Sequence, residues 1–185
     1  MNIVYGGSFD PPTVAHAEIL RRLEEAFHPA RRIVVPTGDS YDWKEKTAFA
    51  HRFRMAQLAF PGCILSDVEQ REGFHGTVDT LRILRSLYGE VHFCMGADNL
   101  LTLPQWKHAD ELVQENFFLV FARGGIDAEG FLRERLPEYR SHFQLLELQA
   151  PVSATAFRQT HDPRLVSPAV YAYAREHHLY GLGET

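Results

Sequence analysis

The stretch GGSFDPPTVAH, residues 6–16, decides how the chain begins and what it can bind. A short apolar run, residues 3–5, precedes it and is typical of a strand. Leu20, Leu23 and Phe27 follow at helical spacing, so the sequence predicts a strand, a glycine turn and then a helix. Two glycines let the backbone bend tightly and let a ligand approach. The free N–H groups at the helix start suit a phosphate, and Thr13 can cap that helix, with His16 one turn further in.

A glycine turn between a strand and a helix is common, and by itself it is more often a structural turn than a binding site. Two known phosphate loops are excluded. The stretch has no Gly-Lys-Ser/Thr ending, so it is not a P-loop, and its glycines lack the dinucleotide-binding spacing. The function of this turn therefore has to be decided by other parts of the chain.

Size and composition favour an ordinary globular protein. We predict one domain over residues 1–185, since 185 residues can bury a substantial core. A net charge of −5 argues against a protein that coats nucleic acid or an anionic membrane. The two cysteines, Cys63 and Cys94, have no metal-type spacing, and no signal peptide or membrane-spanning run is visible, so we expect a cytoplasmic location. The ten histidines are scattered, and we expect no metal site built from protein side chains.

Apolar runs alternate with amphipathic stretches along the chain, which predicts an α/β fold with a doubly wound, mostly parallel sheet. Ligands of such sheets bind at the carboxyl ends of strands, near a switch in strand order. Strands are expected at residues 3–5, 32–35, 64–68, 91–95, 117–121 and 143–148, and helices at residues 13–27, 49–60, 77–88, 153–160 and 168–177.

A second informative string, VSATAFR, occupies residues 152–158. Ser153 is a natural helix N-cap, and Thr155 and Arg158 are three residues apart on one face of the expected helix. Hydroxyls, free N–H groups and a guanidinium at a helix start can hold a polyphosphate. Read alone, the string is more often a simple capped helix.

The third string, FCMGADNLLTLPQWK, occupies residues 93–107 and follows the fourth expected strand with a Gly-Ala-Asp turn. Gly96 leaves room for a ligand, Asp98 can accept hydrogen bonds from ribose hydroxyls, and Trp106 can stack on a flat heteroaromatic ring. A turn glycine, a capping aspartate and a core tryptophan are an equally good reading of this string by itself.

Two of these strings together resemble the signatures of the nucleotidyltransferase α/β-phosphodiesterase superfamily. GSFDP at residues 7–11 and TVAH at residues 13–16 match its first signature, and SATAFR at residues 153–158 matches its second. The resemblance implies a Rossmann-like nucleotidyltransferase fold. It has departures: Thr13 stands where many members have histidine, Phe157 replaces an aliphatic residue, and Ala15 replaces a glycine and leaves less room for phosphates.

The rest of the chain is similar to the nicotinate/nicotinamide mononucleotide adenylyltransferases within that superfamily. The similarity rests on the Gly-Ala-Asp…Trp string, on Arg123 after the fifth expected strand, and on the segment that begins at Thr77. Residues 36–52 resemble a loop whose lysines contact phosphates in the eukaryotic-like branch, which leaves Lys44 or Lys46 for that role.

The resemblance implies an enzyme of NAD biosynthesis that transfers the adenylyl group of ATP to a pyridine mononucleotide, with Mg²⁺ held mainly by the ATP phosphates. Sister transferases, such as a phosphopantetheine adenylyltransferase or a cytidylyltransferase, and a non-catalytic nucleotide-binding protein remain alternatives. The choice between nicotinate and nicotinamide stays open, and the sequence indicates no particular oligomeric state. The resemblance implies His16, Arg158 and Lys44 as catalytic residues. The implied ATP contacts are Gly7, Ser8, Phe9, Thr13, His16, Gly96, Asp98, Ser153, Thr155 and Arg158. The implied substrate-binding residues are Thr77, Trp106 and Arg123, of which Trp106 and the Thr77 segment would hold the pyridine.

Overall fold

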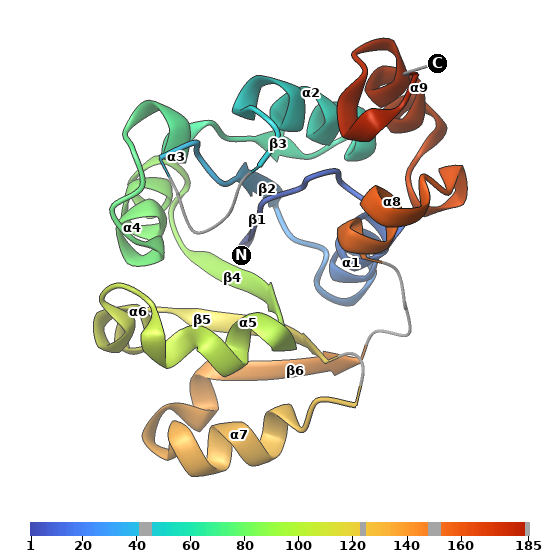
Figure 1. Ribbon diagram of the computed structural model, residues 1–185. Helices are drawn as coiled ribbons and strands as arrows, with labels where there is room; N and C mark the ends of the chain where they lie inside the picture. Colours follow the sequence, from blue (N-terminus) through green and yellow to red (C-terminus); the bar gives the residue numbers. More distant parts are fainter. Residues whose placement is uncertain (41–45, 123–124, 148–152, 184–185) are drawn as a thin grey trace.

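Six strands form one fully parallel sheet in the computed structural model of the chain (Figure 1). The structure describes residues 1–40, 46–122, 125–147 and 153–183. The spatial order of the strands is β3-β2-β1-β4-β5-β6. Their bounds are Asn2–Gly7 (β1), Arg31–Pro36 (β2), Ile64–Leu65 (β3), Val91–Gly96 (β4), Phe117–Ala122 (β5) and Phe143–Glu147 (β6).

Helices cover both faces of this sheet, as the alternation along the strands requires. Val4 and Ile33 pack on one face, in a core shared with the helices α4 to α7. Their neighbours Ile3 and Val34 pack on the other face against α1 and α2. Strands buried on both faces need continuous apolar runs, which is why these strands contain few polar residues. The helices are Val14–Phe27 (α1), Phe49–Ala59 (α2), Val68–Arg71 (α3), Thr77–Tyr88 (α4), Ala97–Thr102 (α5), Ala109–Glu115 (α6), Ala128–Arg135 (α7), Ala154–Thr160 (α8) and Pro168–Glu176 (α9).

Among the described residues, four short 3₁₀ turns link or end these elements. They are Leu103–Gln105 (η1), Pro137–His142 (η2), Pro163–Leu165 (η3) and Leu179–Gly181 (η4). A third, smaller core lies among α2, α8 and α9, where Met55, Phe157 and Val170 are completely buried. This core packs α8 against α2 and α9. Residues of α1 and α8 line one cavity, although more than a hundred residues separate the two helices in the sequence (Figure 1).

The strand order reverses between β1 and β4, and this is the point at which a doubly wound sheet opens a crevice. β1 leads outward to β2 and β3, whereas β4 leads outward to β5 and β6. The glycine turn after β1 and Gly96 at the end of β4 therefore meet at one sheet edge. The predicted α/β doubly wound fold is confirmed, with a sheet that is entirely rather than mostly parallel.

The sequence prediction was wrong in two places. A strand was expected over residues 64–68, but β3 ends at Leu65 and Val68 already begins α3, where its side chain is buried. The expected turn after the fourth strand is the start of α5. Short apolar runs do not distinguish a strand from a helix, which explains the first error. The second arose because glycine and aspartate are typical of turns, whereas here they begin a helix. The helices α6 and α7 were not predicted.

In the described part of the chain, no helix is long and apolar enough to cross a membrane. Cys63 and Cys94 are free thiols.

Candidate active site

Two adjoining cavities open at the carboxyl edge of the sheet. The first, of about 270 Å³, is lined by His16 and is called the histidine cavity. The second, of about 470 Å³, is lined by Trp106 and is called the tryptophan cavity. Their common wall consists of Gly6, Gly7, Ser8 and Asn99. Two ligands, one in each cavity, would therefore meet at the glycine turn that follows β1.

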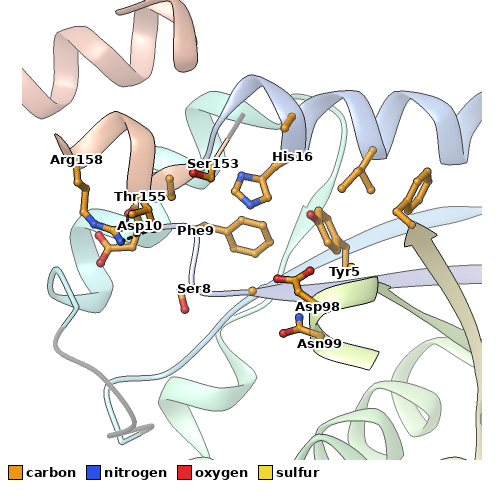
Figure 2. Close-up of a pocket in the computed structure, with 17 residues that line it drawn as sticks. Tyr5, Ser8, Phe9, Asp10, His16, Asp98, Asn99, Ser153, Thr155 and Arg158 are labelled. Atoms are coloured by element: carbon orange, nitrogen blue, oxygen red, sulfur yellow. Dashed lines mark hydrogen bonds between the residues drawn. The ribbon is translucent and has the colours of Figure 1, made fainter. Parts of the chain in front are cut away.

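Side chains of α1, α5, α8 and the glycine turn meet in the histidine cavity (Figure 2). Figure 2 shows Arg158 and Thr155 of α8 gathered with Asp10 at one end of the cavity, Asp98 and Asn99 at the other, and His16 of α1 between them. Of the ten residues that the sequence assigns to ATP, nine line this cavity: Gly7, Ser8, Phe9, His16, Gly96, Asp98, Ser153, Thr155 and Arg158. Thr13 is buried behind His16 and is not part of the cavity wall.

The His16 imidazole is oriented by the residue that caps its helix. The backbone N–H of Thr13 donates to Nδ1 of His16 at 2.9 Å, and the Thr13 hydroxyl lies 2.9 Å from the same nitrogen. A backbone N–H can only donate, so Nδ1 must be the unprotonated nitrogen and the neutral ring carries its proton on Nε2. Thr13 and His16 thus form the reciprocal pair of a capping box, with histidine in place of the usual Glu or Gln.

Phe9 supports the same ring from below. Its φ of 48° is left-handed, a conformation that bulky residues rarely adopt, and its side chain is almost fully buried. The Phe9 ring packs edge-on against His16, with ring centroids 5.3 Å apart, and also against Tyr5 and Phe60. A Cβ at position 7 would lie 3.2 Å from the Phe9 ring, which explains the glycine there.

Helix α8 presents the second set of polar groups. Ser153 is its N-cap and accepts a hydrogen bond from the backbone N–H of Ala156 at 3.1 Å, as the sequence predicts. Arg158 donates to the Thr155 hydroxyl at 3.2 Å and to the backbone carbonyl of Asp10. A guanidinium has five N–H donors, so these two contacts leave others for a ligand. Phe157, as expected for a core-facing position, is fully buried.

The opposite end of the cavity is formed by the start of α5. The Asp98 carboxylate folds back over Gly96, so that a Cβ on Gly96 would collide with its Oδ1. Glycine at this position lets the carboxylate approach closely, and its φ is not positive. Asp98 and Asn99 are exposed, and both can accept hydrogen bonds from a ligand.

The tryptophan cavity brings together Trp106 and Thr77, two of the residues predicted to contact a pyridine ring. The half-buried indole donates from Nε1 to the Thr102 hydroxyl at 3.1 Å and packs edge-on against Phe93. These contacts hold the ring in one orientation in the cavity wall, where an indole can stack on a flat ligand.

Glu69 adds a buried carboxyl to the wall of this cavity. Its Oε1 accepts a hydrogen bond from the Thr80 hydroxyl at 3.1 Å, and its side chain is nearly inaccessible to solvent. Burial raises the pKa of Glu69 to about 7, against smaller opposing effects of hydrogen bonds from Thr80 and Gly38 and of the charges on Lys46 and Arg52. The sequence analysis did not single out this residue, because one glutamate in a polar run carries no signal of burial.

Arg52 is a completely buried cation beneath the glycine turn. It donates to the carbonyls of Thr47 at 2.6 Å and Ser8 at 3.0 Å, and to Oδ1 of Asp39 at 3.0 Å. Asp39 also accepts from the backbone N–H of Phe49 and so stabilises the start of α2, whose N-cap residue is an alanine. This network fixes the position of Ser8, a residue shared by both cavities.

Lys44 and Arg123 lie outside the described residues. Lys46, the alternative to Lys44, donates to the carbonyl of Gly38 at 3.2 Å and is half-buried. Asp10 and Asn99 line the histidine cavity without having been predicted to act there, although Asp10 belongs to the string that opens the chain. Tyr180, which also was not predicted, contacts Asp10.

Comparison with known proteins places this arrangement in a family. Residues 4–160 match the family model described as cytidylyltransferase-like. A protein of Acholeplasma laidlawii is 32% identical over 186 residues, which cover 97% of this chain and 97% of the relative. One of Albidiferax ferrireducens is 34% identical over 190 residues and 96% of each chain. Both carry the name "Probable nicotinate-nucleotide adenylyltransferase".

A solved structure agrees with the fold. The nicotinic acid mononucleotide adenylyltransferase of Plasmodium falciparum, complexed with NaAD, superimposes with a TM-score of 0.80 at 23% identity and covers 98% of this chain and 97% of its own. At that identity the match establishes the shared architecture.

Proposed function

This chain belongs to the cytidylyltransferase-like family, and we propose that it transfers the adenylyl group of ATP to nicotinate mononucleotide, giving the dinucleotide and pyrophosphate in NAD biosynthesis. The observation that carries the proposal is the common wall of the two cavities, formed by residues 6–8 and Asn99. With ATP in the histidine cavity and the mononucleotide in the tryptophan cavity, the reacting phosphates would lie at this wall. The names of the relatives support nicotinate as the acceptor.

The reaction needs no protein base in this arrangement. The second pKa of a phosphate monoester is about 6, so the 5′-phosphate of the mononucleotide is already mostly dianionic at neutral pH. One of its oxygens forms a bond to the α-phosphorus of ATP, the bond from that phosphorus to the bridging oxygen breaks, and pyrophosphate leaves with the electron pair. The protein contributes alignment of the reactants and stabilisation of charge on the phosphate oxygens.

The polar groups of the histidine cavity fit this task. His16 would donate from Nε2–H to the phosphates, because Thr13 occupies its Nδ1. Arg158, with Ser153 and Thr155 at the start of α8, would hold the β- and γ-phosphates at the end of the cavity opposite Asp98. Asp98 would accept from the adenosine ribose, and Gly7, Ser8 and Phe9 would line the phosphate channel.

The tryptophan cavity fits the acceptor. Trp106 would stack on the pyridine ring, and the Thr77 end of α4 would face the ring substituent. This cavity distinguishes the proposal from the sister transferases, whose acceptors lack a pyridine ring. Arg123 and Lys44 remain predicted contacts of the substrates.

We further propose that Mg²⁺ enters with ATP and is held mainly by phosphate oxygens and water. In the described part of the chain, no three or more His, Cys, Asp or Glu side chains group together as metal ligands, which is compatible with a metal carried by the substrate. A cytoplasmic location also remains a prediction, supported by the two free thiols.

The test is an assay of the purified chain with ATP, magnesium and either nicotinate or nicotinamide mononucleotide, followed by pyrophosphate release. We expect pyrophosphate release when ATP and a mononucleotide are both present. We expect a higher kcat/KM for nicotinate mononucleotide than for nicotinamide mononucleotide. A higher kcat/KM for nicotinamide mononucleotide would contradict the proposal that nicotinate mononucleotide is the acceptor. No release with either acceptor, from protein that binds ATP, would support a non-catalytic nucleotide-binding protein or a sister transferase instead.

A further inference from the structure

The turn η4, near the C-terminal end of the chain, contacts the histidine cavity through Tyr180. The partner of Tyr180 is Asp10, which lines the end of the cavity where Arg158 lies. Tyr180 belongs to η4, and its hydroxyl donates to Oδ1 of Asp10 at 2.7 Å across 170 positions of sequence. Tyr180 itself has a left-handed backbone, with a φ of 59°, a strained conformation for an aromatic residue. Strain at one residue persists where surrounding contacts outweigh it, and the contacts of Tyr180 converge on the site.

Asp10 connects three segments of the chain. Its carboxylate accepts from Tyr180 and, through Oδ2, from the backbone N–H of Thr47 at 3.1 Å. Its backbone carbonyl accepts from the Arg158 guanidinium. The side chain is almost fully buried, so these contacts are shielded from competing water. Asp10 thus links the segment before α2, the C-terminal turn and the arginine of α8 at one point.

Tyr180 also contacts α8 directly. Its ring packs edge-on against Phe157, with centroids 5.8 Å apart, and Phe157 is the buried neighbour of Arg158. The tyrosine therefore touches the glycine-turn segment with its hydroxyl and the arginine helix with its ring. Burial, together with the negative charge of Asp10, raises the pKa of Tyr180, so the hydroxyl stays protonated and remains a donor at every physiological pH.

We propose that Tyr180 is a positioning residue for the polyphosphate of ATP, acting through Asp10 on Arg158. The Tyr180 hydroxyl holds the Asp10 carboxylate, which fixes the Asp10 carbonyl, and this carbonyl sets the direction of the guanidinium. Without the hydroxyl, the Asp10 backbone and Arg158 gain freedom, and the ordering of Arg158 must then come from the binding energy of ATP. The inference rests on the proposed function to the extent that Arg158 holds the β- and γ-phosphates.

The test compares ATP with AMP, because AMP lacks the phosphates that Arg158 would hold. Dissociation constants of both nucleotides are measured calorimetrically on the full chain, with magnesium and without a mononucleotide. For Tyr180→Phe we expect the Kd of ATP to rise about tenfold, the loss of one hydrogen bond to a charged group, and the Kd of AMP to change by less than about twofold.

Tyr171→Phe is a matched control. Tyr171 packs edge-on against the same Phe157, with ring centroids 6.4 Å apart, and among the described residues its hydroxyl has no hydrogen-bond partner. Removal of the Tyr171 hydroxyl should leave the Kd of ATP and the Kd of AMP unchanged. In the Arg158→Ala background, Tyr180→Phe should add less than about twofold to the Kd of ATP, because the residue through which it acts is gone.

Three results would overturn the proposal: an unchanged Kd of ATP in Tyr180→Phe, an equal weakening of ATP and AMP, or a full additional effect in the Arg158→Ala background. If Tyr180→Phe does not fold, Asp10→Ala replaces it, which keeps the Asp10 backbone carbonyl and removes the carboxylate that the Tyr180 hydroxyl holds. The expected pattern is then the same selective loss of ATP, and a loss shared by AMP contradicts the proposal. Wild-type protein that binds ATP but releases no pyrophosphate would refute the proposed function and leave this inference standing.

Discussion

Nδ1 of His16 lies 2.9 Å from the backbone nitrogen of Thr13, and this contact leaves Nε2 as the nitrogen that carries the proton. The Thr13 hydroxyl lies equally close, and Phe9 packs against the ring from another side. The imidazole is therefore fixed in orientation and tautomer before any nucleotide binds. Such a preorganised donor stabilises developing charge without the cost of reorientation.

For His16→Ala we expect kcat for adenylyl transfer to fall by a factor of about 10² or more, because a phosphate donor is lost. Loss of the capping box should cost about 1 kcal/mol of stability, so the protein should remain folded. Steady-state kinetics and thermal unfolding measure the two effects. His161→Ala, which removes a histidine that follows the C-terminal end of α8, is the control. Near-normal turnover of folded His16→Ala protein would show that His16 does not act on the phosphates.

For Arg158→Ala we expect the KM for ATP to rise at least tenfold, with the KM for the mononucleotide little changed. The reason is that charge-assisted hydrogen bonds to phosphate are worth more than neutral ones, and Arg158 lies at one end of the histidine cavity only. Arg158→Lys should recover part of the loss, since lysine keeps the charge but not the planar fork. The control is Arg164→Ala, an exposed arginine paired with Asp162. An unchanged KM for ATP in Arg158→Ala would show that Arg158 does not bind the ATP phosphates.

The sequence predicts the elements that local patterns encode. Capping by Ser153, the glycine turn and the buried strands each depend on neighbouring residues, and the structure agrees with them. Tyr180 could not be assigned in this way, because its partner Asp10 lies 170 positions away and no spacing rule connects them. Glu69 is similar: its burial depends on the packing of α3 against α4, and only tertiary structure reveals it.

For Arg52→Met we expect the free energy of unfolding to fall by about 3 kcal/mol, the usual cost of breaking a buried charged network. The change leaves the carbonyls of Ser8 and Thr47 without their donor and frees the start of α2 from one of its contacts. Urea denaturation measures the loss. Arg54→Met, on the exposed side of the same helix, should cost less than about 0.5 kcal/mol. An equal loss of unfolding free energy in Arg52→Met and Arg54→Met would mean that the buried network stabilises the fold no more than an exposed arginine does.

For Trp106→Ala we expect the KM for the mononucleotide to rise about tenfold or more while the KM for ATP stays within about twofold. Stacking of a ring on an aromatic side chain contributes on the order of 1 to 3 kcal/mol, and Trp106 lines only the tryptophan cavity. Trp106→Phe keeps an aromatic face and should lose less. If the KM for ATP rises instead, the two nucleotides occupy the opposite cavities from those proposed.

For Glu69→Gln the informative quantity is the pH dependence of stability. The pKa of Glu69 is raised from 4.5 to about 7 in the folded protein, so the folded state binds one proton more than the unfolded state between these values. Stability then falls as pH rises through this window, and above it the ionised carboxylate costs about 3 kcal/mol relative to pH 4.5. Glutamine has no proton to lose, so the variant lacks this cost.

The stability of Glu69→Gln minus that of wild type should therefore increase by about 3 kcal/mol between pH 4.5 and pH 8, as measured by urea denaturation across the range. Taking the difference cancels the other titrating groups, and a constant cost of burying the amide shifts the whole curve without changing its slope. The charges on Lys46 and Arg52 lower the pKa of Glu69, and the value of about 7 already includes this smaller opposing effect. Glu134→Gln, at an exposed position, controls for the loss of one negative charge. A difference that falls with pH would mean that Glu69 is held as a carboxylate by these two cations.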